Sequence, residues 1–415
     1  MEIEAETVQP KIHAALHRIL TGLAQYQFIS RSFLLTSSDK QTAYRALQKG
    51  MAQGFIKEYT LANKIGGRIF RSGYYGITGL GLQYLLDHDD MISFGLRGDR
   101  DELQARIAES GRAPSLQSEK MARYLSISGT AFLASLMGAS TSPIFPPSGQ
   151  KKSEQTATDC SDPDDVESLP EEMNKAGFSD DSTRISGNNG FVFLNAYEIK
   201  RLLAGNVGQY SGYHAGRFTG ILESETKSVL VYTGSKGGMS WSKVATKPEF
   251  KAHHVYSAKY SAYKNLPGGE NHGIMFVQNA RSFANLYLDV AHKRKEDMFA
   301  DQFNSFVIFP VDSYGVINAL EYIEIDLADY ERQFAEAAIQ SGIYKANTSG
   351  HTTLFPLKNL NGIPMTIGVF IEGVKLNRLR TIYEKTAAAY GVICYQWQID
   401  FYQRVIPEAI FMTIN

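Results

Sequence analysis

Residues 11–88 carry the pattern that most constrains the fold of this chain. Apolar residues at helical spacing in Lys11–Tyr26 predict a first helix, and the run QFISRSFLL predicts a short second helix. Ser37-Ser38-Asp39 supplies N-cap side chains for a third helix, which ends at Gly54. Two strand-like runs, KEYTLA and RIFRSGYYGIT, flank a turn at Gly66-Gly67, and LGLQYLLDH predicts a closing helix. This order predicts a winged helix-turn-helix.

Positive charge is concentrated in the same part of the chain. Between Val8 and Tyr75 there are ten lysines and arginines against two acids, although the whole chain has a formal net charge of −1. A polyanion is the natural partner of such a segment, because each neutralised phosphate releases condensed counterions. We therefore expect it to bind double-stranded DNA. The alternatives are a solvated basic face and a winged helix used for protein contact.

The winged-helix prediction assigns roles to individual side chains. In this fold the third helix enters the major groove, and the hairpin touches the backbone or the minor groove. If Ala43, Leu47 and Phe55 face the core, five side chains of the third helix project outward: Lys40, Gln41, Tyr44, Arg45 and Gln48. Arginine and glutamine can contact guanine and adenine edges in a bidentate manner. Four further cations are predicted to meet phosphates, namely Lys49, Lys64, Arg68 and Arg71.

The length and composition of the chain predict several domains. A chain of 415 residues exceeds what one hydrophobic core usually supports. We predict a winged helix in 1–95, a helical connector in 96–140, a flexible acidic linker in 141–189 and an α/β domain in 190–415. The linker is predicted because prolines punctuate it and because ten acids against three lysines lie between Lys151 and Thr183. Helices at 98–112 and 117–138 would form the connector, and dimerisation through 98–138 is consistent with paired half-sites.

Residues 190–415 read as strands alternating with helices. This pattern favours a mixed sheet covered by helices, hence an α/β or α+β fold. The strand-like runs are RFTGILE, SVLVYTG, GIMFVQN, NSFVIFP, MTIGVFI and GVICYQWQI. The helical runs are AYEIKRLLAG, ARSFANLYLDVAHKRKED, DLADYERQFAEAAIQ and KLNRLRTIYEKTAAAY.

The compartment is predicted from cysteine usage and from apolar segments. Cys160 and Cys394 are the only cysteines and lie far apart, which fits a reducing environment. The most apolar stretch, Thr130–Met137, is far shorter than the ~20 residues that span a bilayer. The acidic start MEIEAETVQP is unlike a secretory signal. We expect a cytoplasmic protein without membrane contact.

One family resemblance emerges from these segments. The run SRSFLLTSSDKQTAYRALQKGMAQGFIKEY, followed by RIFRSGYYGITGLGLQYL, resembles the N-terminal winged helix of the replication–relaxation family. The likeness continues in SEKMARYLSISGTAFLASLMGA, NAYEIKR, GRFTGILES, VLVYTGSKGGMSW and VICYQWQIDF. Members are carried by plasmids and integrative conjugative elements and include mobilisation relaxases. The resemblance implies origin binding and relaxosome assembly with other conjugation proteins. A transcriptional regulator whose C-terminal domain senses a ligand or mediates oligomerisation is the second hypothesis.

The resemblance also implies a C-terminal domain similar to PD-(D/E)xK nucleases, in which carboxylates hold Mg²⁺ or Mn²⁺ and a lysine assists catalysis. The Arg-Pro-Asp of several family members is missing here. Glu249 and Lys251, in the run PEFK, are the candidate catalytic pair of a third hypothesis, a metal-dependent nickase. Glu198 in NAYEIK is expected on a solvated helix face. No metal-binding set is predicted, and the pair His13 and His17 is expected at the surface or near phosphate.

Overall fold

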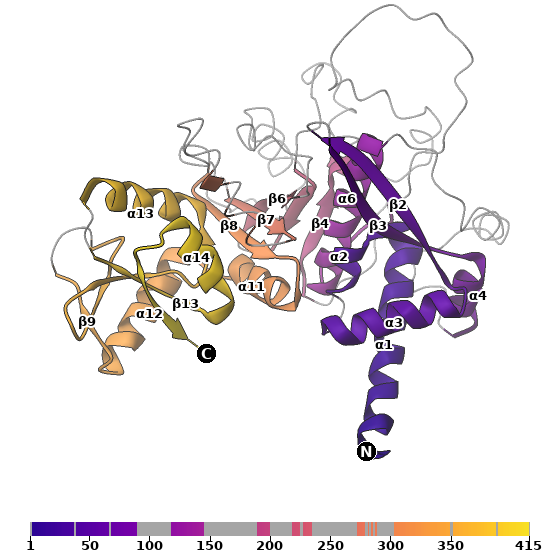
Figure 1. The fold of residues 1–415 in the computed structure, drawn as a ribbon, viewed down its shortest axis with the longest axis horizontal. Helices are drawn as coiled ribbons and strands as arrows, with labels where there is room; N and C mark the ends of the chain where they lie inside the picture. Colours follow the sequence, from indigo (N-terminus) through magenta and orange to yellow (C-terminus); the bar gives the residue numbers. More distant parts are fainter. Residues whose placement is uncertain are drawn as a thin grey trace, which may run out of the picture. The chain divides into compact units, whose positions relative to one another are not determined.

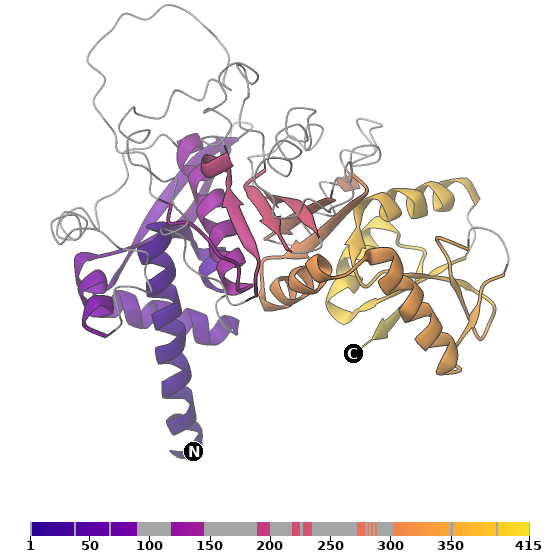
Figure 2. The same cartoon turned by 180° about the vertical axis from the view of Figure 1, so that it is seen from behind.

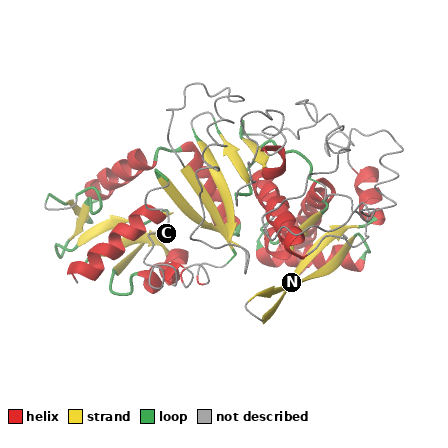
Figure 3. Cartoon of the chain, turned by 90° about the horizontal axis from the view of Figure 1, so that it is seen from above, coloured by secondary structure: helices red, strands yellow, loops and turns green. Residues whose placement is uncertain are grey.

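The computed structural model describes residues 2–36, 39–65, 68–88, 118–144, 189–199, 218–224, 227–234, 272–278, 303–348, 352–386 and 389–414, together with isolated helical residues between 281 and 288. The chain is a mixed α/β protein, as predicted, and its described strands and helices are distinguished in Figure 3. It divides into two compact units, and the described residues up to 224 fall in the first unit and those from 227 in the second. No helix among the described residues is long and apolar enough to cross a membrane.

The first unit begins with the predicted order of helices and hairpin, with one additional strand. The second of its helices is a single turn. The elements are α1 (Glu2–Tyr26), β1 (Phe28–Ser30), α2 (Arg31–Leu34), α3 (Lys40–Ala52), β2 (Ile56–Ile65), β3 (Arg68–Ile77) and α4 (Gly79–His88). Figure 1 shows α1 crossing α3 and projecting beyond it toward the N-terminus.

Residues 28–30 form a strand, so the prediction that they open the second helix was wrong. Gln27 ends α1 with a positive φ of 54°, and the chain then pairs with β3 in an antiparallel manner. Phe28 lies opposite Gly76, where a Cβ atom would come within 2.7 Å of the Phe28 ring. The missing side chain at Gly76 therefore admits the ring. The resulting sheet has the order β1-β3-β2.

Helix α3 forms where the sequence predicts it. The carboxylate of Asp39 accepts hydrogen bonds from the backbone N–H groups of Gln41 and Thr42, at 3.1 and 2.9 Å, which satisfies the free donors of the first turn. Gly54, with φ of 73°, follows the last turn in the left-handed conformation. Ala43 and Leu47 are fully buried, as predicted. Phe55 is only partly buried and stacks on Tyr84.

Helix α6 (Ser118–Leu136) is an integral part of the first unit. It packs against β1, β2 and α2, beside the hairpin in Figures 1 and 2. The Ser128 hydroxyl donates to the carbonyl oxygen of Phe28 at 2.7 Å, and Gly129 leaves room for the ring of Phe33. Among its side chains that the structure describes, Lys120 alone is exposed. Most of the described side chains of α6 are therefore turned toward the first unit, whereas residues 96–117, the rest of the predicted connector before this helix, lie outside the described residues.

The residues on either side of the segment 145–188, which was predicted as part of a linker, lie next to each other in the first unit. Thr141 is buried and its hydroxyl bonds that of Tyr26 at 2.6 Å, so the chain is still packed at the predicted start of the linker. The backbone of Ser140 exchanges two hydrogen bonds with residues 191 and 193, at 2.7 and 2.8 Å. Asn189 donates from its side chain to the carbonyl oxygen of Met137. Residues 145–188, between these anchors, lie outside the described part of the chain.

The described residues after this segment also belong to the first unit, although a separate domain was predicted from residue 190. Strands β4 (Val192–Asn195) and β5 (Gly220–Glu223) pair in an antiparallel manner and lie against α6. Arg123 of α6 donates to the carbonyl oxygen of Phe218 at 2.6 Å. Glu198 accepts from Asn195 and Ser142, so it caps the helical turn after β4 and is not on a solvated face.

The second unit contains a group of parallel strands followed by a mixed five-stranded sheet. β6 (Ser228–Gly234), β7 (His272–Val277) and β8 (Ser305–Pro310) are parallel, and β12 (Ile371–Glu372) pairs with β8 in an antiparallel manner. The second sheet has the order β14 (Ile410–Ile414), β13 (Gly391–Tyr395), β11 (Pro364–Ile367), β10 (Leu357–Asn359) and β9 (Tyr344–Ala346). Its first three strands are parallel.

Among the described residues, four complete helices accompany these strands, and two of them match predicted helical runs. α12 (Leu327–Gln340) and α13 (Gly373–Thr386) match predicted helical runs, whereas α11 (Ser313–Glu324) and α14 (Ile399–Val405) do not. The run MTIGVFI, predicted as one strand, is divided between β11 and β12. At Gly368 between them a Cβ atom would collide with the side chain of Val392, so the chain bends there and passes from one sheet to the other.

Candidate nucleic-acid interface

The outer face of α3 presents the five side chains that the sequence assigned to it. Helical periodicity places Ala43, Ala46, Leu47 and Gly50 in the core, so the opposite face is exposed. Tyr44 is 41% exposed although it is a large aromatic residue. All five predicted side chains are exposed: Lys40, Gln41, Tyr44, Arg45 and Gln48.

Four exposed cations of α2, α3 and β3 have no acidic partner among the described residues. Arg31, Lys40, Arg45 and Arg71 are exposed, and none of them forms an ion pair within the part of the chain that the structure describes. The only acids in this region of the sequence are Asp39, which caps α3, and Glu58. Within the described part of the chain no acidic side chain pairs with these cations, so a ligand that supplies anionic oxygens could bind their donors.

The other predicted phosphate contacts are placed differently. The ammonium of Lys49 donates to Nε2 of His13 on α1 at 3.0 Å, so Lys49 lies on the side of α3 that faces α1. This contact requires His13 to accept with a neutral ring nitrogen. Lys64 and Arg68 lie at the end of the hairpin, where Ile65 pairs with Arg68, and their side chains are outside the described part of the structure.

One face of the hairpin continues the interface. Arg71, Gly73 and Tyr75 alternate along β3 on the same face, and Glu58 lies opposite Tyr75 on β2. The Tyr75 hydroxyl donates to the Glu58 carboxylate at 3.0 Å. Burial, with the charge of Glu58, raises the pKa of Tyr75 to about 12, so the hydroxyl stays a hydrogen-bond donor at neutral pH.

Arg31 joins α3 to this hairpin face, which sequence reasoning did not foresee. Its guanidinium lies over the ring of Tyr44, 5.3 Å from the centroid. The charge of Arg31 acts to lower the pKa of Tyr75, and Tyr44 acts to raise it, so both side chains interact electrostatically with the hairpin. In the sequence, Arg31 is one of the ten lysines and arginines between Val8 and Tyr75 and has no other predicted role. No spacing within the sequence signals a contact between the first residue of α2 and the middle of α3.

The opposite face of the hairpin is a packing surface. Tyr59 and Tyr74 stack with ring centroids 5.3 Å apart, and Phe28 meets both rings edge-on. Tyr124 of α6 contacts Phe28 from the other side. This aromatic layer fixes the hairpin on the core, whereas Arg71 is exposed on the other face.

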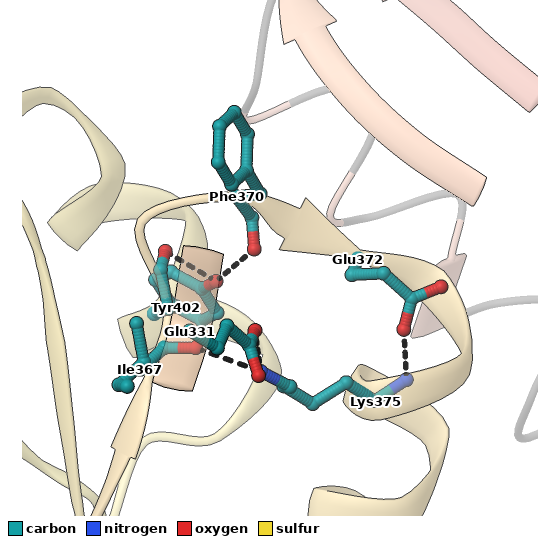
Figure 4. Close-up of polar contacts among 7 residues, drawn as sticks. Glu331, Ile367, Phe370, Glu372, Lys375 and Tyr402 are labelled. Atoms are coloured by element: carbon teal, nitrogen blue, oxygen red, sulfur yellow. Dashed lines mark hydrogen bonds and ion pairs between the residues drawn. The ribbon is translucent and has the colours of Figure 1, made fainter. Parts of the chain in front are cut away.

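The second unit contains a polar cluster where the chain crosses between sheets (Figure 4). Tyr402 donates to the carbonyl oxygen of Gly368 at 2.9 Å, and Gln398 donates to that of Val369 at 2.6 Å. Lys375 donates to the carbonyl oxygen of Ile367 at 3.0 Å and forms an ion pair with Glu331. Each donor satisfies the backbone of the crossover, so the cluster has a structural role.

Glu372 completes this cluster as a helix cap. Its carboxylate accepts from the backbone N–H of Lys375 at 2.6 Å, in the first turn of α13, and from that of Phe306 on β8 at 3.1 Å. The carboxylate therefore joins the start of the helix to the neighbouring strand. Both hydrogen bonds serve the fold.

The predicted catalytic pair, Glu249 and Lys251, lies outside the described residues. Within the part of the chain that is described, no group of three or more His, Cys, Asp or Glu side chains could hold a metal ion. Comparisons with protein families, with curated proteins and with solved structures found no match to this chain.

Proposed function

We propose that this protein binds double-stranded DNA through the exposed face of α3, with its N-terminal unit acting as a winged helix. One observation carries the proposal. Exposed cations of α2, α3 and β3 form no ion pair with a described residue, and two exposed glutamines lie on α3 beside them. Phosphates are the partners that such cations require. A protein partner with an acidic surface is the alternative that an experiment must separate.

The proposal gives the two kinds of side chain different tasks. Gln41, Arg45 and Gln48 follow one another along α3, where a helix lying in the major groove would direct them at base edges. Arg71 lies on the hairpin face, and we assign it to the phosphate backbone. The resemblance to the replication–relaxation family leads us to propose an origin of a mobile genetic element as the target, where the protein would help to assemble a relaxosome.

Binding of the full-length protein to a pool of random duplexes, measured by fluorescence anisotropy between 50 and 300 mM salt, tests the proposal. We expect the logarithm of the affinity to fall linearly with the logarithm of the salt concentration, by roughly 0.9 per phosphate contact. Salt-insensitive binding, or none, would contradict the proposal. Sequencing of the retained duplexes then gives the site, and its position at a transfer origin rather than at the protein's own promoter separates mobilisation from regulation.

Arg45→Ala tests the assignment of base readers. We expect a loss of about 1–3 kcal/mol at one base-pair position of the selected site, because a bidentate contact discriminates by that amount. Arg332→Ala is the matched control, since Arg332 is an exposed cation of α12 whose side chain is 59% accessible. An equal loss on all sequences would make Arg45 a phosphate contact instead.

A further inference from the structure

The contact between Arg31 and Tyr44 joins α2 to the exposed face of α3. The guanidinium lies 5.3 Å from the centroid of the Tyr44 ring, within the range of a cation–π interaction. Arg31 also acts on Tyr75 through its charge, but it forms no ion pair with a residue that the structure describes. Among the described residues, its guanidinium is held by the ring of Tyr44 and is not engaged by a carboxylate.

Tyr44 is itself fixed by its place on α3. It follows Ala43, which is fully buried, so its Cα position is set by the packing of the helix on the core. Tyr75, whose hydroxyl is engaged by Glu58, lies close enough for both Arg31 and Tyr44 to affect its pKa. The guanidinium thus lies over Tyr44 of α3, and its charge also acts on Tyr75 of the hairpin.

Resting on the proposed DNA-binding function, we propose that Arg31 contacts a phosphate beside the α3 binding face, and that Tyr44 is a positioning residue which orients Arg31 by its ring and reads no base. An arginine that is ordered before binding loses less conformational entropy when it meets the phosphate. The proposal gives Tyr44, one of the five outward side chains of α3, a positioning role and no contact with a base. It also explains why a large aromatic side chain is kept exposed at the centre of the face.

The variants Arg31→Gln, Tyr44→Leu, Tyr44→Phe and the double variant Arg31→Gln/Tyr44→Leu test this in the full-length protein. Affinity is measured for the selected duplex and for a scrambled one, over a series of salt concentrations. We expect Arg31→Gln to weaken binding about fivefold on both duplexes and to reduce the salt slope by about 0.9. Tyr44→Leu should have a similar effect, whereas Tyr44→Phe, which keeps the ring, should bind like the wild type.

The double variant gives the decisive comparison. If Tyr44 acts through Arg31, the double variant binds no more weakly than Arg31→Gln alone. If the double variant loses affinity by the product of the two single losses, Tyr44 acts independently of Arg31 and the proposal is overturned. If Tyr44→Phe weakens binding as much as Tyr44→Leu, the Tyr44 hydroxyl contacts DNA itself, which also overturns the proposal. A wild-type protein that binds no duplex refutes the proposed function, whereas a wild type that binds and an Arg31→Gln variant that binds equally well refute this inference alone.

Discussion

Lys375 and Glu331 form an ion pair that joins α13 to α12, while the same ammonium donates to the carbonyl oxygen of Ile367 at 3.0 Å. Both side chains are largely buried, with exposures of 14% and 20%. The lysine therefore neutralises a carboxylate and satisfies the last carbonyl of β11 at once.

Lys375→Met should lower the free energy of unfolding of the second unit by about 1–3 kcal/mol, because it leaves Glu331 and a backbone carbonyl without their donor. Urea unfolding followed by circular dichroism measures the loss. Arg332→Met is the control, since its ion pairs with Asp329 and Glu336 are exposed and its loss should leave the free energy of unfolding almost unchanged. Equal effects of the two variants would show that the crossover does not depend on Lys375.

Gly129→Ala should destabilise the first unit by about 1–3 kcal/mol, although the same change in an exposed helix is usually stabilising. A Cβ atom at Gly129 would collide with the ring of Phe33. Thermal unfolding of Gly129→Ala, of Phe33→Leu and of the double variant measures the coupling. We expect the double variant to lose less than the sum of the single changes. Strict additivity would mean that α6 does not pack on α2 in solution.

Alkaline pH should unfold the protein through buried groups that resist ionisation. Burial raises the pKa of Cys394 to about 12, and burial, opposed by a hydrogen bond to Thr141, raises that of Tyr26 to about 12. Groups with a raised folded pKa contribute stability that is complete below the unfolded pKa, near 9 and 10, and that is lost as pH rises toward 12. The free energy of unfolding should therefore fall between pH 9 and 12, and less steeply in Cys394→Ala. A flat profile over this range would contradict the burial of both groups.

Glu58→Gln should strengthen DNA binding severalfold at low salt if the proposed function holds. The substitution removes a negative charge from the hairpin face beside Tyr75 while keeping an oxygen that can accept from its hydroxyl. The gain should vanish at high salt, because exposed charges are then screened. Glu336→Gln, on the exposed face of α12, is the control. A gain that persists at 0.5 M salt would point to a changed conformation rather than to charge.

Capping residues and apolar spacing predict an element correctly where its stability depends on residues close by in the sequence. Asp39 and Gly54 delimit α3, and its apolar spacing gives the buried face. The strand at Phe28 could not be predicted in this way, because its stability comes from β3, more than forty residues later, and from a glycine that admits its ring. Long-range pairing leaves little trace in a local pattern.

The residues of the candidate site also fall into two groups: those that local periodicity predicts, and those that depend on tertiary contacts. The outward residues of α3 follow from helical periodicity, whereas Lys49 turned out to face His13 on α1. Arg31 joins the site only through the tertiary contact of α2 with α3. In the second unit, Gly368 separates two strands that hydropathy alone presents as one, because a bend depends on local volume and not on apolar content.

The two anchors around residues 140 and 191 have a practical consequence for handling the protein. A protease that nicks the intervening 145–188 stretch would cut the polypeptide without freeing either piece, since backbone hydrogen bonds on both sides still hold them together. On a denaturing gel such material would run as two bands, yet it would elute from a sizing column as an intact particle.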